Sequence, residues 1–247
     1  MKTLKDFSFK GKRALIRVDF NVPLNTTKEV TDATRIEAAL PTISYILRQG
    51  GSVVLMSHLG RPSGGYEADY SLSHIVSTLS GLLGKAVEFA GDCIGEQSYS
   101  VTNNLGEGKV VLLENLRFHN EEKKGDSAFA EKLSKHGDIY INDAFGTAHR
   151  AHASTAIIAS FFEGNSCFGL LMQKELESVR KVMQNSAKPF TAIIGGAKVS
   201  SKISIIQNLM DKLDNLIIGG GMSYTFVKAM GGRVGDSLVE DKYLEEA

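Results

Sequence analysis

The sequence has 247 residues, 43% of them hydrophobic, which is enough for a sizeable core in one large domain or two. Its 28 Lys and Arg residues balance 28 Asp and Glu residues, which argues against a nucleic-acid-binding domain defined by overall basic charge, although not against a local basic cleft. The N-terminal residues contain no apolar signal core and no apolar run approaches membrane-spanning length, so we expect a cytoplasmic protein without a membrane partner.

The first predicted strand begins in the apolar run at Ala14 and ends in polar side chains. Pro23 has no N–H group to donate and should stop the strand. Asp19 and Asn21 are two residues apart, so they should project from one side of it. Either they cap a turn, or they contact a ligand in the crevice beyond the carboxyl ends of the strands, as in many open α/β sheets.

Strand-like and helix-like patterns then alternate. Short apolar runs predict further strands at 52–57, 86–89, 109–113, 138–143 and 167–172. Helical spacing predicts a helix capped by Asp32 or Thr31 and stopped by Gly50 and Gly51, with Pro41 causing a kink or a late start. Two more helices should run from Ser71 to Gly84 and from Asp126 to Gly137. This alternation predicts an α/β fold with a Rossmann-like parallel sheet and helices on both faces.

A second, similar domain should follow. An amphipathic pattern predicts a connecting helix from about Met172 to Asn185, and strands at 190–194 and 215–218 flank another helical pattern. We therefore predict a first domain at 1–171, a connector at 172–186, and the opening βα units of a second domain at 187–247. So small a second part is too short for a secure core of its own.

The cysteines and three of the histidines suggest no chemistry. Cys93 and Cys167 lie far apart in apolar surroundings and match no metal-binding spacing, so reduced, buried thiols are expected. The three histidines are His74, His119 and His136. None shares the placement of the basic residues described below, and we expect them to be ordinary surface residues.

Other basic residues share one kind of location, just after a predicted strand or at the start of the first helix: Arg35, His58, Arg61, Arg117, His149 and Arg150. In a parallel sheet these positions lie on the carboxyl edge, where four arginines can converge on one crevice. Guanidinium groups suit carboxylates and phosphates, so the pattern predicts a small ligand with more than one negative charge. The alternative is that each arginine forms a separate surface ion pair.

The segment Gly195-Gly-Ala-Lys-Val-Ser-Ser-Lys202 follows a strand and opens a helix. Free N–H groups and the helix dipole attract phosphate in such a place, and Lys198 and Lys202 should share one helix face. The segment matches neither the P-loop nor the dinucleotide fingerprint, and a plain tight turn is the alternative. Gly219-Gly-Gly221 repeats the arrangement one strand later, which favours a nucleotide lying across both turns.

Six motifs, in order along the chain, resemble those of phosphoglycerate kinase: Arg17-Val-Asp-Phe-Asn-Val-Pro23, Ser57-His-Leu-Gly-Arg-Pro62, Glu114-Asn-Leu-Arg-Phe118, Asn142-Asp-Ala-Phe-Gly146 with Ala148-His-Arg-Ala-His152, Gly195-Gly-Ala-Lys198 and Gly219-Gly-Gly-Met222. The resemblance covers nearly all of the chain. It implies a monomeric, hinge-bending enzyme of glycolysis, a phosphotransferase with a carboxyl group as acceptor, which moves a phosphoryl group between 1,3-bisphosphoglycerate and ADP to give 3-phosphoglycerate and ATP.

The resemblance also implies a role for each matching position. Asp19 and Asn21 would hold the glycerate hydroxyl, and Arg35 would contact the carboxyl region and support the phosphoryl group in transit. The non-transferred phosphate would be gripped by His58, Arg61, Arg117 and Arg150, with His149 nearby. The nucleotide phosphates would be lined by Gly196, Ala197, Lys198, Lys202 and Gly220, with Lys202 reaching the transferred group.

Two departures from the family pattern matter. Ser201 stands where many members carry Asp, so a local role of that carboxylate is in doubt. The chain also stops at Ala247, well short of a family chain, and the ligands of the nucleotide's Mg²⁺ are expected beyond its end. We therefore keep a second hypothesis, in which the isolated polypeptide is a non-catalytic 3-phosphoglycerate-binding or anion-binding module, because domain closure requires two complete domains.

Overall fold

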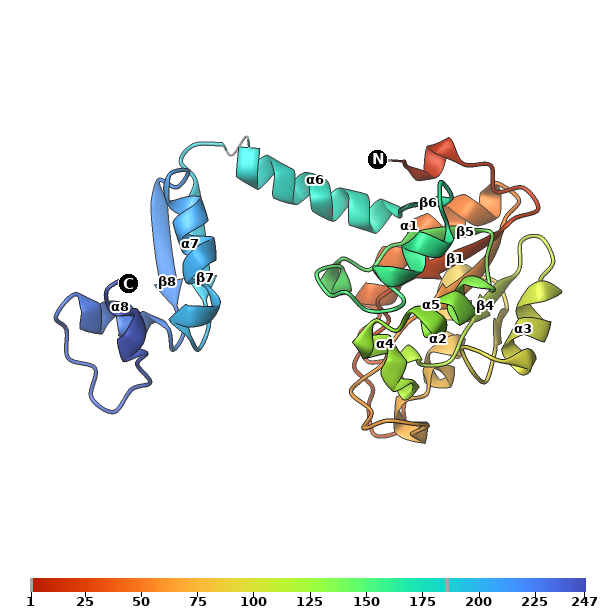
Figure 1. Cartoon of the computed structure of the whole chain (residues 1–247), viewed down its shortest axis with the longest axis horizontal. Helices are drawn as coiled ribbons and strands as arrows, with labels where there is room; N and C mark the ends of the chain where they lie inside the picture. Colours follow the sequence, from red (N-terminus) through yellow and green to blue (C-terminus); the bar gives the residue numbers. More distant parts are fainter. Residues whose placement is uncertain (1, 185–186) are drawn as a thin grey trace. The chain divides into compact units, whose positions relative to one another are not determined.

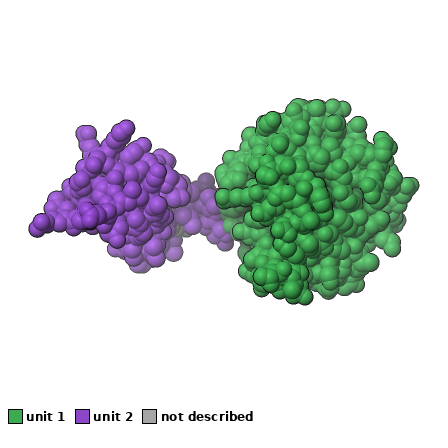
Figure 2. All heavy atoms as spheres, turned by 90° about the horizontal axis from the view of Figure 1, so that it is seen from below, with its two compact units in different colours: residues 1–175 green, residues 176–247 purple. Residues whose placement is uncertain are grey.

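A computed structural model describes residues 2–184 and 187–247 (Figure 1). The chain divides into two compact units, Met1–Glu175 and Leu176–Ala247 (Figure 2). The predicted connector corresponds to helix α6, Leu170–Gln184, and Asn185 lies outside the described residues. The finer domain boundaries at 171 and 187 stay a prediction. Among the described helices, none combines the length and the apolar character needed to cross a bilayer.

The first unit contains the predicted parallel sheet of six strands, in the order β3-β4-β2-β1-β5-β6. Every pairing in it is parallel, with Arg17 of β1 opposite Met56 of β2 and Asn142 of β5. The carboxyl ends of these strands therefore lie along one edge. The strands are β1 (Arg13–Arg17), β2 (Ser52–Met56), β3 (Val87–Phe89), β4 (Val110–Leu112), β5 (Ile139–Asn142) and β6 (Ser166–Phe168).

Alternation of side chains along the strands divides the interior into two cores. Ala14 and Ile16 of β1 lie in a core with helices α1 (Thr34–Arg48) and α2 (Val76–Leu83), whereas Leu15 between them lies in a core with α5 (Ser127–Ser134). Helices thus cover both faces of the sheet (Figure 1), as the pattern of apolar runs predicted.

Helix starts and stops partly follow the sequence signals. Helix α1 begins at Thr34 and runs through Pro41, with Ala33 as its N-cap rather than Asp32 or Thr31; the Asp32 carboxylate accepts a hydrogen bond from the Thr34 N–H group at 2.9 Å. Ser71 caps a 3₁₀ turn that leads into α2, and Gly84 ends α2 in the left-handed conformation that glycine favours. Asp126 caps α5, which ends at Ser134, before Gly137.

The predicted strand at 167–172 is wrong in its second half. Strand β6 ends at Phe168, and residues from Leu170 onward are helical. The break falls at Gly169, where any side chain would collide with the carboxylate of Asp143. The helix α3 (Glu96–Asn103) was missed because its one aliphatic residue, Val101, gives no helical period. A further short helix, α4, spans Asn120–Lys124.

The second unit has two parallel strands, β7 (Thr191–Gly195) and β8 (Asn215–Gly219), with Gly195 opposite Gly219 at their carboxyl ends. Helices α7 (Ile203–Met210) and α8 (Ser223–Ala229) follow the strands. Its buried apolar core consists of Val199, Ile206 and Met222. This is the predicted opening of a second α/β domain.

Candidate functional site

A cavity of about 420 Å³, here called the basic cavity, lies at the carboxyl edge of the first sheet. Five cationic side chains and only one carboxylate line it, so it suits a ligand with several negative charges. All four predicted arginines are present. The lining residues are Asp19, Asn21, Arg35, His58, Arg61, Arg117, Lys123, Gly146, Thr147 and Arg150.

Three of the arginines have no carboxylate partner in the described part of the chain. Within the described residues, no Asp or Glu oxygen lies within salt-bridge distance of Arg61, Arg117 or Arg150. Burial and the nearby guanidinium groups of Arg17 and Arg150 lower the pKa of Arg117. The surface-ion-pair interpretation therefore fails for these three residues, whereas Arg35 does donate to the Asp19 carboxylate at 2.8 Å.

Asp19 and Asn21 both line the basic cavity, but they do not lie on a strand, because β1 ends at Arg17. The second oxygen of the Asp19 carboxylate accepts a hydrogen bond from the Asn21 N–H group at 3.2 Å. The side-chain oxygen of Asn21 accepts one from the Gly60 N–H group at 2.8 Å. These bonds tie the segment after β1 to the segment after β2, and they leave both polar side chains at the cavity wall.

His149 contacts Arg150 of the cavity wall but does not itself line the cavity. Its ring is exposed and accepts a hydrogen bond from Arg150 Nε at 3.3 Å. Three lining residues were not predicted as site residues: Lys123, Gly146 and Thr147. Lys123 belongs to a mixed run of two acidic and two basic residues on a short helix, where sequence does not show which side chain faces inward.

A fully buried arginine lies behind the cavity wall. Arg17 is 1% exposed, and it donates from Nε to Ser154 Oγ at 2.9 Å and from a terminal nitrogen to His58 Nδ1 at 3.1 Å. Its other terminal nitrogen contacts the Val18 carbonyl. Burial first, and then the positive charges of Arg17, Arg117 and Arg35, lower the pKa of His58 to about 2, so its imidazole is neutral at ordinary pH.

Glu122 balances the charge of this buried arginine. Its carboxylate is 1% exposed and accepts hydrogen bonds from Ser154 Oγ at 2.6 Å and from the Ser154 N–H group at 3.0 Å. One serine hydroxyl thus joins a buried cation to a buried anion, which offsets much of the cost of burying either. Sequence reasoning missed Arg17 and Glu122; the only signal was an arginine directly after the apolar run at residues 14–16.

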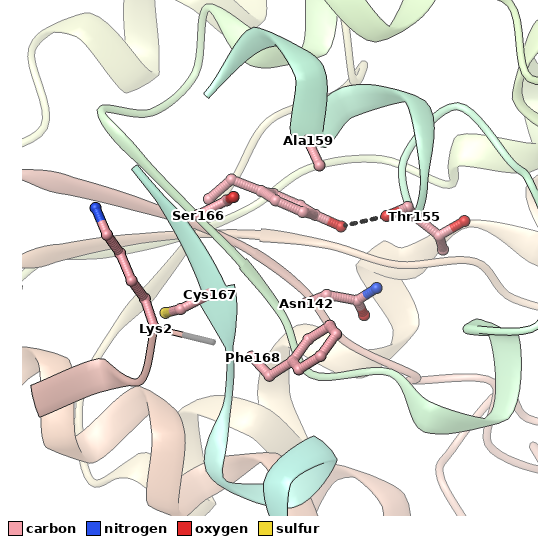
Figure 3. Close-up of a pocket in the computed structure, with 8 residues that line it drawn as sticks. Lys2, Asn142, Thr155, Ala159, Ser166, Cys167 and Phe168 are labelled. Carbon is pink, nitrogen blue, oxygen red and sulfur yellow. Dashed lines mark hydrogen bonds between the residues drawn. The ribbon is translucent and has the colours of Figure 1, made fainter. Parts of the chain in front are cut away.

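A second cavity, of about 260 Å³, lies by strands β5 and β6 (Figure 3). Its lining includes Asn142, Cys167 and Phe168, with Lys2 as its one charged group. The Tyr140 hydroxyl donates to the carbonyl oxygens of Ser154 at 2.8 Å and of Thr155 at 3.1 Å. These hydrogen bonds hold the segment that carries Ser154. With one charged residue in its lining, the second cavity does not resemble a site for a highly charged ligand.

In the second unit the two glycine turns touch each other. The Met222 N–H group donates to the Gly196 carbonyl at 2.8 Å. Gly220 has a φ of +72°, and a Cβ there would lie 2.8 Å from the Gly196 oxygen. Glycine is therefore required at 220 for both conformation and space. The turns after β7 and β8 are adjacent, as a ligand spanning both would need.

The prediction that Lys198 and Lys202 share one helix face is wrong. Lys198 is extended and precedes a 3₁₀ turn at Val199–Ser201, and Lys202 is the N-cap of α7. The Ser201 hydroxyl donates to the Lys198 carbonyl at 2.8 Å. The phosphate-binding roles expected of these residues stay a prediction.

One of the three dismissed histidines, His136, is not a surface residue. His136 is fully buried, with Nδ1 2.8 Å from Thr102 Oγ1 and Nε2 3.1 Å from the Cys93 carbonyl. His119 is partly buried and lies 2.9 Å from the Asp92 carboxylate. Both cysteines are free and buried, as expected. The fold brings Asp92, Cys93 and His119 within 4.8 Å of one another, a grouping that sequence spacing did not indicate.

Comparison with known proteins identifies the family. Residues 4–247 match the family model of phosphoglycerate kinase. The phosphoglycerate kinase of Borrelia hermsii is 52% identical over 247 residues, which are 100% of this chain and 62% of that protein. That of Porphyromonas gingivalis is 49% identical and is matched over 99% of this chain and 64% of its own length.

Solved structures agree with these matches. Phosphoglycerate kinase from Coxiella burnetii has 38% sequence identity and a TM-score of 0.83, and the match covers 98% of this chain and 60% of that chain. The enzyme from Pyrococcus horikoshii has 33% identity and a TM-score of 0.84, with coverage of 95% and 59%. This chain spans about three fifths of the length of these relatives. It belongs to the phosphoglycerate kinase family.

Proposed function

We propose that this chain carries the 3-phosphoglycerate site of a phosphoglycerate kinase, whose whole form transfers a phosphoryl group between 1,3-bisphosphoglycerate and ADP. The observation that carries the proposal is the convergence of four arginines on one cavity, three of them without a carboxylate partner in the described residues. Such a cavity attracts a compact ligand that bears a phosphate and a carboxylate. Location in the cytoplasm, a monomeric state and hinge-bending stay predictions from the sequence.

The roles proposed within the cavity are those that the resemblance to the family implies. Arg61, Arg117 and Arg150 would hold the non-transferred phosphate, with His58 donating one neutral hydrogen bond. Asp19 and Asn21 would accept the hydroxyl of the glycerate. Arg35, exposed and bound to Asp19, would reach the carboxyl group at which phosphoryl transfer occurs. The residues thus act by positioning and by charge stabilisation, which is what phosphoryl transfer requires.

The nucleotide, ADP or ATP, would lie across the adjacent glycine turns of the second unit, at the N-terminus of α7. Mg²⁺ accompanies such nucleotides and prefers oxygen ligands. In residues 2–184 and 187–247, the one cluster of metal-binding side chains contains a thiol and an imidazole and lies in the first unit. A thiol and an imidazole do not fit Mg²⁺, which prefers oxygen ligands.

Titration calorimetry of the chain with 3-phosphoglycerate tests the binding site. We expect binding, and we expect Arg61→Ala and Arg150→Ala each to weaken it by at least tenfold, because a charge-assisted hydrogen bond contributes roughly 1.5–3 kcal/mol. The control is Arg48→Ala, which removes an arginine from the far end of α1 and should leave affinity unchanged. Binding that survives both cavity substitutions would refute the convergence argument.

A second candidate function is anion binding without catalysis by the 247-residue polypeptide itself. The described part of the second unit supports it, since its sheet has two strands and leaves Ile193 76% and Ile217 50% exposed. A coupled assay that follows ADP formation from ATP and 3-phosphoglycerate distinguishes the two. We expect no turnover by this polypeptide; turnover in the range of about 1–100 s⁻¹ typical of kinases would exclude the second candidate.

A further inference from the structure

A directed chain of hydrogen bonds leads from the buried Glu122 to the wall of the basic cavity. Ser154 Oγ lies 2.6 Å from a Glu122 oxygen and 2.9 Å from Arg17 Nε, and another Arg17 nitrogen lies 3.1 Å from His58 Nδ1. Arginine has only hydrogen-bond donors, and an ionised carboxylate has only acceptors. The donor and the acceptor of each hydrogen bond in this series are therefore fixed. Ser154 therefore donates to Glu122 and accepts from Arg17.

The same reasoning reaches the imidazole. Because Arg17 cannot accept a hydrogen bond, His58 Nδ1 must be the acceptor and carries no proton. A neutral imidazole then holds its proton on Nε2. Among the described residues Nε2 has no hydrogen-bond partner of its own, and His58 is part of the cavity lining.

We propose that Arg17 is a positioning residue that fixes the tautomer of His58, so that a neutral Nε2–H group is presented to the anion in the basic cavity. The inference deepens the proposed function, since the anion is taken to be 3-phosphoglycerate. Arg17 does not line the cavity and is 1% exposed, so it acts through His58 rather than on the ligand.

The planar fork of arginine is essential to this arrangement. One guanidinium contacts Ser154, His58 and the Val18 carbonyl through three separate nitrogens. A lysine ammonium keeps the charge that balances Glu122, but it is a single point on a flexible stem and does not reproduce the fork. Arg17→Lys thus separates the charge of the residue from its geometry.

The test is NMR of the 247-residue chain labelled with ¹⁵N in its histidines. The His58 signals are assigned by their loss in His58→Gln. We expect an unprotonated Nδ1 and a protonated Nε2 in the unmodified chain, and a mixture of tautomers in Arg17→Lys. In calorimetry, Arg17→Lys should bind 3-phosphoglycerate about fivefold more weakly, the effect of losing the alignment of one hydrogen bond.

Two further variants keep the test sharp if Arg17→Lys does not fold. Ser154→Ala cuts the link between Glu122 and Arg17 with a minimal change and should broaden or shift the same His58 signals. Ser98→Ala removes another buried serine, on α3, and should change neither the tautomer nor the affinity. A proton on Nδ1 in the unmodified chain, or an unchanged tautomer in folded Arg17→Lys, would overturn the proposal. Absence of 3-phosphoglycerate binding would instead defeat the proposed function, while the tautomer is still measured.

Discussion

Buried histidines link the stability of the first unit to pH. His136 is fully enclosed between Thr102 and the Cys93 carbonyl, and burial lowers its pKa from 6.5 to about 4. In the unfolded chain the same imidazole titrates at its ordinary pKa. As pH falls from 6.5 towards 4, the His136 imidazole therefore becomes protonated in the unfolded state while it stays neutral in the folded state. The free energy of unfolding decreases as a result.

This difference predicts a measurable slope. In the unmodified chain, uptake of one proton by His136 on unfolding should lower the free energy of unfolding by about 1.4 kcal/mol for each pH unit between pH 6 and 4.5. We expect the slope in His136→Gln to be smaller by this amount, because the variant has no imidazole at this position. Urea unfolding at several pH values, followed by circular dichroism, gives the slope. His149→Gln is the matched control, since that ring is exposed. Equal slopes for His136→Gln and the unmodified chain would contradict the assignment.

A site residue could be predicted from the sequence where its position relative to a predicted strand indicates its location in the fold. Arg61, Arg117 and Arg150 could be grouped because each follows a strand, and parallel strands end at one edge. Arg17 could not, because an arginine directly after an apolar run does not show which buried acid will balance it. Its partner, Glu122, is more than a hundred positions away and becomes visible only in the fold.

At the level of elements, the contact between the two glycine turns of the second unit leaves no room for a side chain at Gly220. A Cβ at Gly220 would lie 2.8 Å from the Gly196 oxygen and 3.0 Å from its nitrogen, and the φ of +72° is itself unfavourable for other residues. Gly231 has a φ of +83°, yet a Cβ there would meet nothing within 4 Å. An alanine at Gly231 would introduce only backbone strain, whereas an alanine at Gly220 would introduce both strain and a steric collision.

We expect Gly231→Ala to destabilise the second unit by about 1–2 kcal/mol, the cost of a left-handed conformation for a residue with a Cβ. Gly220→Ala should destabilise it further and should also weaken ADP binding, because the turns must move apart. Denaturant unfolding and calorimetry with ADP measure the two effects. If Gly220→Ala binds ADP as well as Gly231→Ala does, the nucleotide does not lie across these turns.

Element boundaries show where sequence patterns lose information. The strands of the first unit were found because each is a short apolar run between helical patterns, but the run at 167–172 contains both the end of a strand and the start of a helix. Only the contact between Gly169 and Asp143 shows where one gives way to the other. Lys198 and Lys202 were placed on one helix for a similar reason: a 3₁₀ turn and an α-helix look alike at this length.

At the scale of the whole molecule, the two units differ most in their cores. The first has two extensive apolar clusters, one on each face of a six-stranded sheet. In the described part of the second unit, the buried apolar core is limited to Val199, Ile206 and Met222. Because burial of apolar surface is the main stabilising term, the units should unfold at different denaturant concentrations.

This asymmetry predicts that residues 1–175 fold alone. All residues that line the basic cavity lie within this range, as do both large cores. We expect the excised unit to keep the high-urea transition of the 247-residue chain, to lack the low-urea transition, and to bind 3-phosphoglycerate within about twofold of the longer chain, the usual limit of additivity for independent parts. Arg61→Ala in the excised unit should repeat the loss seen in the longer chain. A single shared transition, or an excised unit that folds but does not bind, would mean that the site depends on residues beyond 175.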